Sequence, residues 1–263
     1  VEVEYNGGLW KYSGTRYWYP GHEHSFVAVH PAEAVKNSVG LSYADSKLSF
    51  VYSLPMAADG VTIDKAAAFD LLAATHRRLY NDGVTTAVTL RFSHLMSLLN
   101  LAPAFVDNLM GNDDYILIHR LELSGVNTSA RFDILPAQRL SNPQTDDKVV
   151  DITPSGESNS VIVLPTPVKI NNHQGNVSLF ADNDAIIIIP QSFAAGSDAS
   201  IIFHFSINEE TTMRQVALPL SNLNWDSGKS YLYKVTFERS GLVLDKCEIN
   251  SWNDIKGDEI TVD

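Results

Sequence analysis

Two histidines flank a glutamate at His22–Glu23–His24, and this tripeptide resembles a set of metal ligands. Side chains two residues apart on a strand point to the same face, so both imidazoles could bind one zinc ion. No third ligand lies nearby, and the tripeptide follows Pro20–Gly21, which is typical of a turn. We therefore favour a solvated loop. A metallohydrolase that uses His22, His24 and a distant carboxylate is the weakest of three functional hypotheses.

Ser93–His94 places a hydroxyl next to a base, but the Gly-x-Ser-x-Gly turn and acidic partner of a serine hydrolase are not evident. His94, His119 and His204 all lie in strand-like segments, where we expect hydrogen-bonded structural histidines. Neither a Gly-x-Gly-x-x-Gly nor a Walker pattern occurs, so no phosphate-binding loop is predicted. The chain is therefore predicted to have no catalytic residues, no cofactor and no metal site, and not to be an enzyme.

Two further patterns could bind ligands. Asp182–Asn183–Asp184 begins like a calcium loop but lacks the downstream Gly and Glu, so we interpret it as a turn. Aromatic residues near strand ends more often close a core than stack on sugars. The four tryptophans nevertheless leave open a surface glycan-binding or adhesin module as the alternative function: Trp10, Trp18, Trp225 and Trp252.

The composition is that of a folded, acidic protein. Of its 263 residues, 44% are hydrophobic and 19% are charged, which argues against intrinsic disorder and suits one large or two ordinary domains. Lys and Arg number 19 against 31 Asp and Glu, a net charge of −12, which argues against a general nucleic-acid-binding function. The longest apolar run, Ala185–Pro190, has strand length. The lone Cys247 excludes an intrachain disulfide and a multi-cysteine zinc site.

The dominant hydrophobic pattern has a period of two, which is typical of strands with one buried face. It is clearest in five segments: Leu48–Leu54, Val84–Phe92, Tyr115–Leu123, Ser200–Ile207 and Tyr231–Phe237. Shorter strands are expected at Phe26–Val29, Ser160–Leu164, Val177–Phe180, Gln215–Leu220, Leu242–Ile249 and Ile260–Val262. Frequent Gly, Pro, Asn and Asp turns separate these segments. The sequence therefore predicts an all-β protein made of antiparallel sandwiches.

Two segments depart from this pattern. Asp64–Tyr80 places apolar residues at helical spacing, which predicts a helix or a helical excursion across a sheet edge, with a loop as the alternative. Residues 136–148 hold two prolines and no periodicity, so we predict a linker there. A cut at residue 140 gives an N-terminal domain of residues 1–140 and a C-terminal domain of residues 141–263.

Several short motifs together resemble the fimbrillin-like proteins of Bacteroidetes. In chain order they are Tyr17–Pro20 with Phe26–Pro31, Asp70–Ala74, Leu90–Ser97, Ile187–Gln191, Trp225–Tyr233 and Ile249–Trp252. They are similar to that family's YWP…FxAYxP, DLLxA, LxFxHxxS, IxPQ and WxxGKxYxY…IxxW passages. Each motif alone is weak, but their shared order over nearly the whole chain makes the resemblance specific.

The resemblance implies two transthyretin-like antiparallel β-sandwich domains. The short helical excursion expected from the periodicity of Asp64–Tyr80 lies in the first domain. The chain departs from the family in that the usual first strand of this domain is expected to be missing. It implies a type V pilus subunit that assembles by donor-strand exchange, with no enzymatic activity. The expected partners are other pilin subunits, in a homopolymer or heteropolymer, and a host protein or glycan, but not nucleic acid. Stalk, anchor and tip positions stay open.

The resemblance also bears on export. The chain begins at Val1 without a Met or a signal peptide, so we expect that a longer precursor exists. The family implies a lipoprotein precursor that is carried to the outer-membrane surface and touches the membrane only through its lipid anchor.

We expect six residues to be architectural rather than chemical. These are Phe92 and His94 in the first domain, and Trp225, Tyr231, Tyr233 and Trp252 as core aromatics of the second domain. Ile260, Thr261 and Val262 are predicted to form an edge strand that could act as a donor strand.

Overall fold

The computed structural model describes residues 3–6, 9–12, 19–36, 38–80, 88–106, 111–138, 148–164, 167–180, 185–238, 241–252 and 260–262. These residues form strands and one five-residue helix, α1 (Ala32–Lys36). No helix in these ranges is long and apolar enough to cross a membrane. The strands are β1 (Val3–Asn6), β2 (Leu9–Tyr12), β3 (Glu23–His30), β4 (Ser42–Ala44), β5 (Lys47–Ser53), β6 (Leu72–Leu79), β7 (Val88–Leu90), β8 (Ser93–His94), β9 (Ser97–Phe105), β10 (Tyr115–Val126), β11 (Ser129–Ile134), β12 (Val150–Ser155), β13 (Asn159–Leu164), β14 (Val168–Asn171), β15 (Ile186–Ile188), β16 (Gln191–Ser192), β17 (Ser200–Ile207), β18 (Arg214–Pro219), β19 (Asn224–Trp225), β20 (Lys229–Glu238), β21 (Gly241–Ser251) and β22 (Ile260–Val262).

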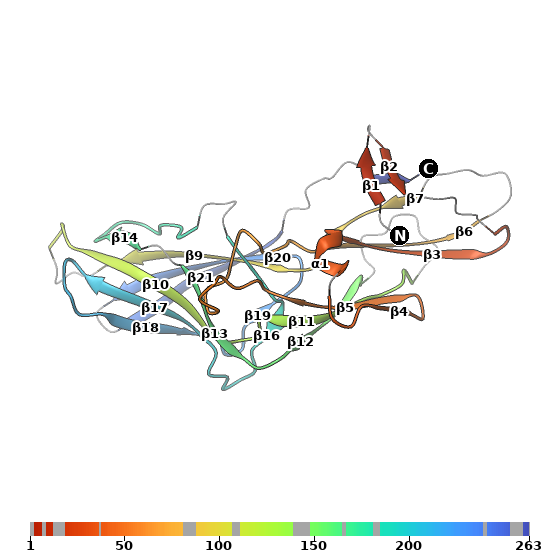
Figure 1. Ribbon diagram of the computed structural model, residues 1–263. Coiled ribbons are helices and arrows are strands. Elements are labelled where there is room, and N and C mark those ends of the chain that lie inside the picture. The colour runs from red at the N-terminus through yellow and green to blue at the C-terminus, as the bar shows by residue number, and fades with distance from the viewer. Residues whose placement is uncertain are drawn as a thin grey trace.

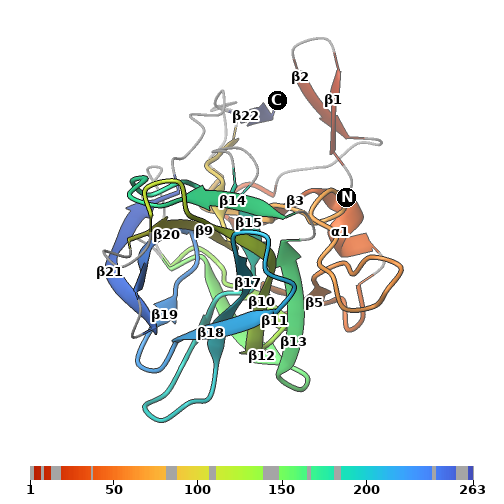
Figure 2. The ribbon, with the colours of Figure 1, turned by 90° about the vertical axis from the view of Figure 1, so that its left-hand side faces the viewer.

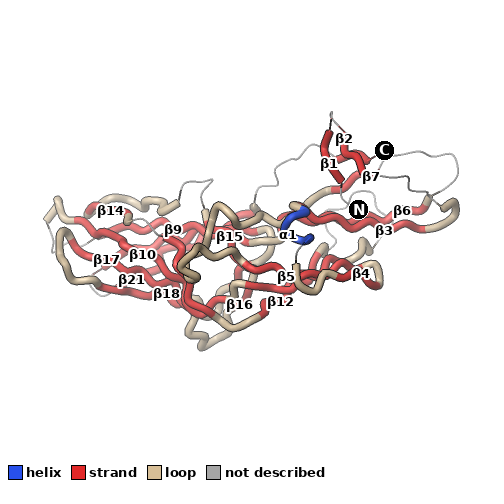
Figure 3. Tube along the Cα trace, in the orientation of Figure 1, coloured by secondary structure: helices blue, strands red, loops and turns tan. Residues whose placement is uncertain are grey.

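The molecule is elongated, and most of its strands belong to two pairs of sheets, one toward each end (Figure 1). The first sheet pair consists of β3-β6-β8 and β12-β11-β5-β4. The second consists of β13-β10-β17-β18, with β14 also paired to β10, and of β15-β9-β20-β21. Viewed along the long axis, the sheets of the second pair lie as two layers (Figure 2). Strands dominate the regular structure (Figure 3), so the all-β prediction is confirmed.

The predicted antiparallel pairing holds for most strands, but β9 and β20 are parallel neighbours, with Leu98 opposite Ser230 and Phe105 opposite Phe237. These two strands come from widely separated parts of the chain. Pairing of this kind depends on contacts between distant segments, which a local hydrophobic pattern does not encode.

The sheets do not divide at residue 140. β9 and β10 precede that residue, yet they pair with β13, β14, β15, β17 and β20, which all follow it. The chain passes from the first sheet pair to the second at β8–β9, returns at β10–β11 and crosses again at β12–β13. Separate sheets on the two sides of residue 140 are therefore incompatible with the register, and a two-domain organisation stays a prediction.

Alternation located the longer strands well. Ser200–Ile207 is strand β17 with the predicted bounds, and the segments predicted at 48–54, 115–123 and 231–237 lie in β5, β10 and β20 with ends shifted by up to three residues. Val177–Phe180 is not a regular strand, although the N–H groups of Val177 and Leu179 donate to β9 carbonyls. Of the strand predicted at 84–92, residues 88–90 form β7, and residues 84–87 lie outside the described part.

The helix predicted within Asp64–Tyr80 is wrong, because residues 72–79 form strand β6, which pairs with β3 along its whole length and with β8 at its start. The adjacent Ala73 and Ala74 are both fully buried. A strand covered on both faces loses its alternating pattern and can imitate helical spacing. The five-residue helix α1 lies elsewhere, directly after β3.

Aromatic side chains fill the space between the sheets. Phe50 of β5 and Phe132 of β11 stack at 5.4 Å in the first sheet pair, and both are fully buried. Phe203 of β17 meets Phe237 of β20 edge-on at 5.4 Å, which joins the two sheets of the second pair. The buried residues of both pairs belong to one hydrophobic cluster, so the two ends of the molecule share a core.

Gly125 lies at a register irregularity of β10, between Leu123 and Val126, and its φ of 70° is in the left-handed region. A Cβ at this position would lie 3.0 Å from the Cα of Ala199. The close approach of two main chains therefore requires glycine here.

We predict that Gly125→Ala lowers the free energy of unfolding by at least about 1–2 kcal/mol, the cost of a left-handed conformation for a residue with a Cβ. Gly175→Ala is the matched control, because a Cβ there meets nothing within 4 Å. We expect the control to stay within about 0.5 kcal/mol of the parent. Urea denaturation measures both, and equal stability of the two variants would contradict the analysis.

Candidate functional site

Five of the six residues predicted to be architectural lie in one contact network, here called the junction network: His94, Trp225, Tyr231, Tyr233 and Trp252. Trp225, Tyr231 and Tyr233 are each only 1% exposed. The Trp225 Nε1–H donates to Tyr233 Oη at 3.0 Å, and the Tyr231 and Tyr233 rings stack at 6.5 Å. Burial raises the pKa of Tyr231 to about 12 and raises that of Tyr233 further, so both hydroxyls stay protonated and available as donors.

His94 ties this network to β8. Its ring stacks on Trp252 with centroids 4.4 Å apart, and its Nδ1 lies 2.8 Å from Asp70 Oδ2. The Asp70 carboxylate is therefore the hydrogen-bonding partner of the His94 ring. His94 O also accepts a hydrogen bond from Ser227 Oγ at 3.1 Å.

The turn after Trp225 is hydrogen-bonded to the segment between β8 and β9, where the chain passes from the first sheet pair to the second. Gly228 N–H donates to Met96 O at 2.9 Å, and Trp252 N–H donates to Gly228 O at 2.9 Å. Gly228 has a φ of 69°, and a Cβ there would lie 3.2 Å from His94 O. These contacts bind three distant segments of the chain together.

The remaining predicted residues lie elsewhere. Phe92 is half-buried between β7 and β8 and is not part of the hydrophobic core cluster. Ile260, Thr261 and Val262 form β22, an edge strand opposite Leu90, Thr89 and Val88 of β7. Their side chains, like that of Trp10 and the whole of Trp18, fall outside the described part of the chain.

Three of the other histidines, His24, His119 and His204, have hydrogen-bonding partners within the fold. Tyr19 N–H donates to His24 Nε2 at 3.3 Å, and His22 precedes β3 in an exposed turn. His119 Nε2 lies 2.8 Å from Ser206 Oγ, and His204 Nε2 lies 3.1 Å from Glu122 Oε2. Among the residues that the structure describes, no three His, Cys, Asp or Glu side chains are placed to hold a metal ion.

A surface with a different character lies along β3, which is the outermost strand of its sheet in the described structure. Leu95 N–H donates to Leu71 O on the β8 side of β6. The main-chain groups of successive residues in a strand point to opposite sides. Since those of Leu71 point toward β8, the N–H and C=O groups of Leu72 and Ala74 in β6 point toward β3. Because their partners are His30 and Ala28, the odd-numbered residues of β3 direct their N–H and C=O groups away from β6.

The opposing sheet ends on the same side of the molecule. Its outermost strand is β4, which joins β5 through Asp45 and Ser46, with φ values of 51° and 60°, a tight hairpin turn of the I′ kind. Tyr43 lies opposite Leu48, whose side chain packs on the core, yet the Tyr43 side chain is 60% exposed. Within the ranges that the structure describes, the first sheet pair is therefore open between β3 and β4.

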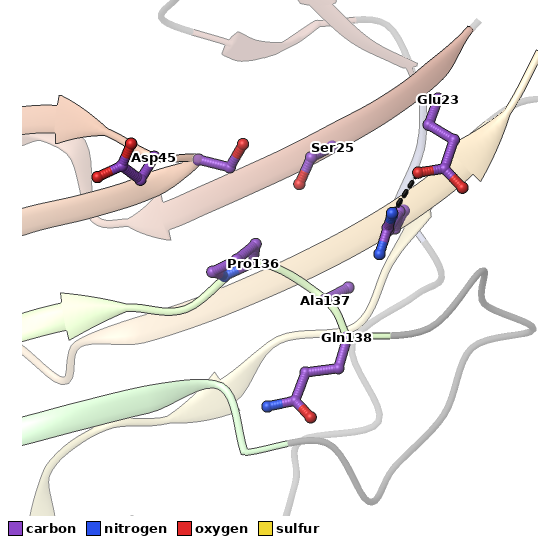
Figure 4. Close-up of a pocket in the computed structure, with 8 residues that line it drawn as sticks. Glu23, Ser25, Asp45, Pro136, Ala137 and Gln138 are labelled. Carbon is purple, nitrogen blue, oxygen red and sulfur yellow. Dashed lines mark hydrogen bonds and ion pairs between the residues drawn. The ribbon is translucent and has the colours of Figure 1, made fainter.

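A cleft of about 340 Å³ occupies this opening, lined by Glu23, Ser25, Asp45, Ser46, Arg77, Pro136, Ala137 and Gln138 (Figure 4). Arg77 Nε donates to Glu23 Oε2 at 3.0 Å. Ser25 Oγ is buried and has no hydrogen-bond partner among the described residues. Helix α1, through buried Val35, packs against β3 and β5 farther along. We name the outward main-chain edge of β3 together with this cleft the open edge.

No local signal in the sequence predicts the open edge. The alternating apolar residues Val27 and Val29 mark β3 as a strand, but nothing local shows which side of a strand stays unpaired. Asp70, the partner of His94, lies in a motif that the analysis singled out, although its role there was not recognised.

We predict that Trp225→Ala lowers the free energy of unfolding by about 3–5 kcal/mol, because the ring is buried and edge-on to Phe193 at 4.8 Å. Trp252→Ala is expected to cost roughly 1–2 kcal/mol, because its ring is half-buried and loses mainly the stack on His94. Chemical denaturation followed by circular dichroism measures both. Equal costs would mean that the two tryptophans do not differ in burial as described.

Comparison with solved structures shows a fold similar to that of a fimbrial protein from Bacteroides vulgatus, with a TM-score of 0.64 and 14% identity over 95% of this chain and 84% of that chain. For a proposed cell adhesion protein from Bacteroides ovatus, the TM-score is 0.46 and the sequence identity is 20%. The match covers 88% of this chain and 68% of that chain. For a second proposed cell adhesion protein, from Bacteroides uniformis, the TM-score is 0.46 and the sequence identity is 15%. The match covers 88% of this chain and 73% of that chain. No curated protein matches significantly.

The sequence also matches a family model described as Fimbrillin-like over residues 1–252. The match includes all motifs on which the resemblance was based, and it agrees with the fimbrial-protein fold. The family consists of fimbrial structural and adhesion proteins and not of enzymes. The chain therefore belongs to the fimbrillin-like family.

Proposed function

We propose that this protein is a structural subunit of a type V pilus and that it receives a donor strand from another subunit at the open edge. The observation that carries the proposal is strand β3, eight residues long, whose odd-numbered residues direct their main-chain groups away from β6. An added strand would pair with these groups and close the first sheet pair.

The inner face of β3 supports the same role. Val27 and Val29 are half-buried and pack against the hydrophobic core, so each retains surface that an incoming strand would cover. Each main-chain hydrogen bond contributes about 0.5–1.5 kcal/mol net, and each buried CH₂ group about 0.8 kcal/mol. Several bonds together with alternating apolar side chains make a stable joint from a short segment.

We further propose that the two sheet pairs are two transthyretin-like sandwich domains, each of which takes strands from both sides of residue 140. The precursor would be a lipoprotein exported to the outer-membrane surface, and the mature subunit would become part of a fimbrium. Its partners would be pilin subunits of the same or another kind. The β22 segment is one candidate donor, and its pairing with β7 would have to open first.

A glycan-binding or adhesin module is the alternative. Sugar-binding tryptophans present one ring face to solvent. Trp225 is 1% exposed, and Trp252 has His94 stacked on its ring, so these two residues give the alternative little support.

The proposed function predicts different effects of proline at neighbouring positions of β3. The Val27 N–H points away from β6, so Val27→Pro removes a donor for an incoming strand and leaves the β3–β6 bonds intact. The Ala28 N–H faces Ala74 of β6, so Ala28→Pro breaks the existing sheet. We expect Val27→Pro to fold and be exported but not to polymerise, and Ala28→Pro to misfold.

The measurement expresses the full precursor together with the maturation protease and examines unboiled samples on SDS gels for polymer ladders. Circular dichroism of the purified subunit checks folding. A normal ladder from a folded Val27→Pro subunit would show that the edge of β3 is not the acceptor.

A further inference from the structure

We propose that the cleft at the open edge selects a donor strand with a basic side chain, Lys or Arg, at the position that faces Ser25. This inference rests on the proposed function, and it adds the chemistry of the partner. It predicts a donor with one cationic residue among apolar residues, which would fix the register as well as the identity of the strand.

The position of the basic residue follows from the register of β3. Ser25, Val27 and Val29 share one face of the strand, and the cleft lies beside Ser25 whereas the two valines pack on the core. Side chains of an added strand that lie opposite these residues point to the same face. The donor residue opposite Ser25 therefore enters the cleft, and the residues two and four positions away contact the valines.

The cleft is polar where the rest of the opening is apolar. Figure 4 shows the Asp45, Ser25 and Glu23 side chains along the cleft, with Gln138 on its other side. Among the described lining residues there are two carboxylates and one guanidinium, and Arg77 is paired with Glu23. Among these described residues, the Asp45 carboxylate is therefore a surplus negative charge.

An apolar donor residue would fill the cleft without forming hydrogen bonds to its polar groups. Ser25 Oγ is buried without a partner among the described residues, and a buried hydroxyl left without a hydrogen bond is costly. An ammonium or guanidinium group can donate to Ser25 Oγ and is attracted by the Asp45 carboxylate, while its aliphatic stem covers apolar surface. A carboxylate in the same place would be repelled by Asp45 and could donate nothing.

The chain's own β22 segment fits this requirement poorly. If Ile260 and Val262 point into the opening, the next residue in the same alternation is Asp258, and residues 258–263 contain no Lys or Arg. The cleft therefore favours a donor from a different kind of subunit over a second copy that offers this segment.

The test uses the full 263-residue chain and four synthetic nine-residue peptides. Each peptide has valine at positions 1, 3, 7 and 9, threonine at the even positions and Lys, Gln, Leu or Glu at position 5. The symmetric design allows either strand direction. Fluorescence anisotropy measures the affinity at low salt. We expect the Lys peptide to bind about tenfold more tightly than the Leu peptide, and the Glu peptide to bind most weakly.

Two variants locate the effect. Asp45→Asn removes the charge but keeps the turn, because Asn tolerates positive φ. Ser25→Ala removes the unpartnered hydroxyl. Both should reduce the preference for Lys over Leu to about twofold or less. The charge-matched control is Glu157→Gln, an exposed residue that follows the far end of β12, and it should leave the tenfold preference unchanged.

The outcomes separate this inference from the proposed function. If all four peptides bind equally, or if the Leu peptide binds most tightly, the inference is overturned while strand acceptance stands. A Lys preference that survives both Asp45→Asn and Ser25→Ala overturns it too, because the cleft is then not its source. If no peptide binds, the inference falls, and the Val27→Pro polymerisation assay decides separately whether the proposed function falls with it.

Discussion

The arrangement of this molecule depends on what pairs with the main-chain groups at the sides of its sheets. In the second sheet pair, residues 173–179, which do not form a regular strand, donate hydrogen bonds to main-chain carbonyls along one side of β9. The N–H groups of His173, Val177 and Leu179 donate to the carbonyls of Phe105, Pro103 and Leu101 at 2.8–2.9 Å. The open edge of β3 has no such cover within the described part of the chain. The proposed acceptance of a strand depends on this contrast between the covered side of β9 and the outward edge of β3.

The junction network connects the first sheet pair to the second. The turn that follows Trp225 contacts β8 and the start of β9, and Trp252 stacks on His94 from the end of β21. These contacts join the first sheet pair to the second through side chains that are largely buried. The two sheet pairs are therefore joined by packed side chains and main-chain hydrogen bonds as well as by the chain itself.

How far the sequence predicts this structure depends on whether a feature is local. Alternation found β5, β10, β17 and β20, because each has one buried and one wetter face. The same criterion failed at β6, where Ala73 and Ala74 are buried on opposite faces. It also could not show that β9 and β20 are parallel neighbours, or that strands cross residue 140 in both directions, because pairing is decided by distant segments.

The candidate site shows the same division. The motif residues His94, Trp225, Tyr231, Tyr233 and Trp252 proved to be spatial neighbours, because residues that share one structural task tend to carry recognisable types and spacing. The open edge has no such motif. Its defining property is the direction in which the main-chain groups of β3 point, and that direction depends on which neighbour β6 chooses. Sequence reasoning could place the strand but not the side on which it stays open.

The charged residues at the open edge bear on two properties of an edge strand: its protection against aggregation and its choice of a partner strand. An apolar edge strand pairs indiscriminately, and proteins commonly protect such strands with inward-pointing charged residues. Glu23 and Arg77 occupy the inner face beside Ser25 and form an ion pair there, and Asp45 adds a negative charge from the opposing sheet. The same residues that discourage an arbitrary apolar strand would accept one with a matching cation. On the proposed function, protection against aggregation and selection of the partner would be two consequences of one polar cleft, because a strand without a matching cation would leave these polar groups without partners.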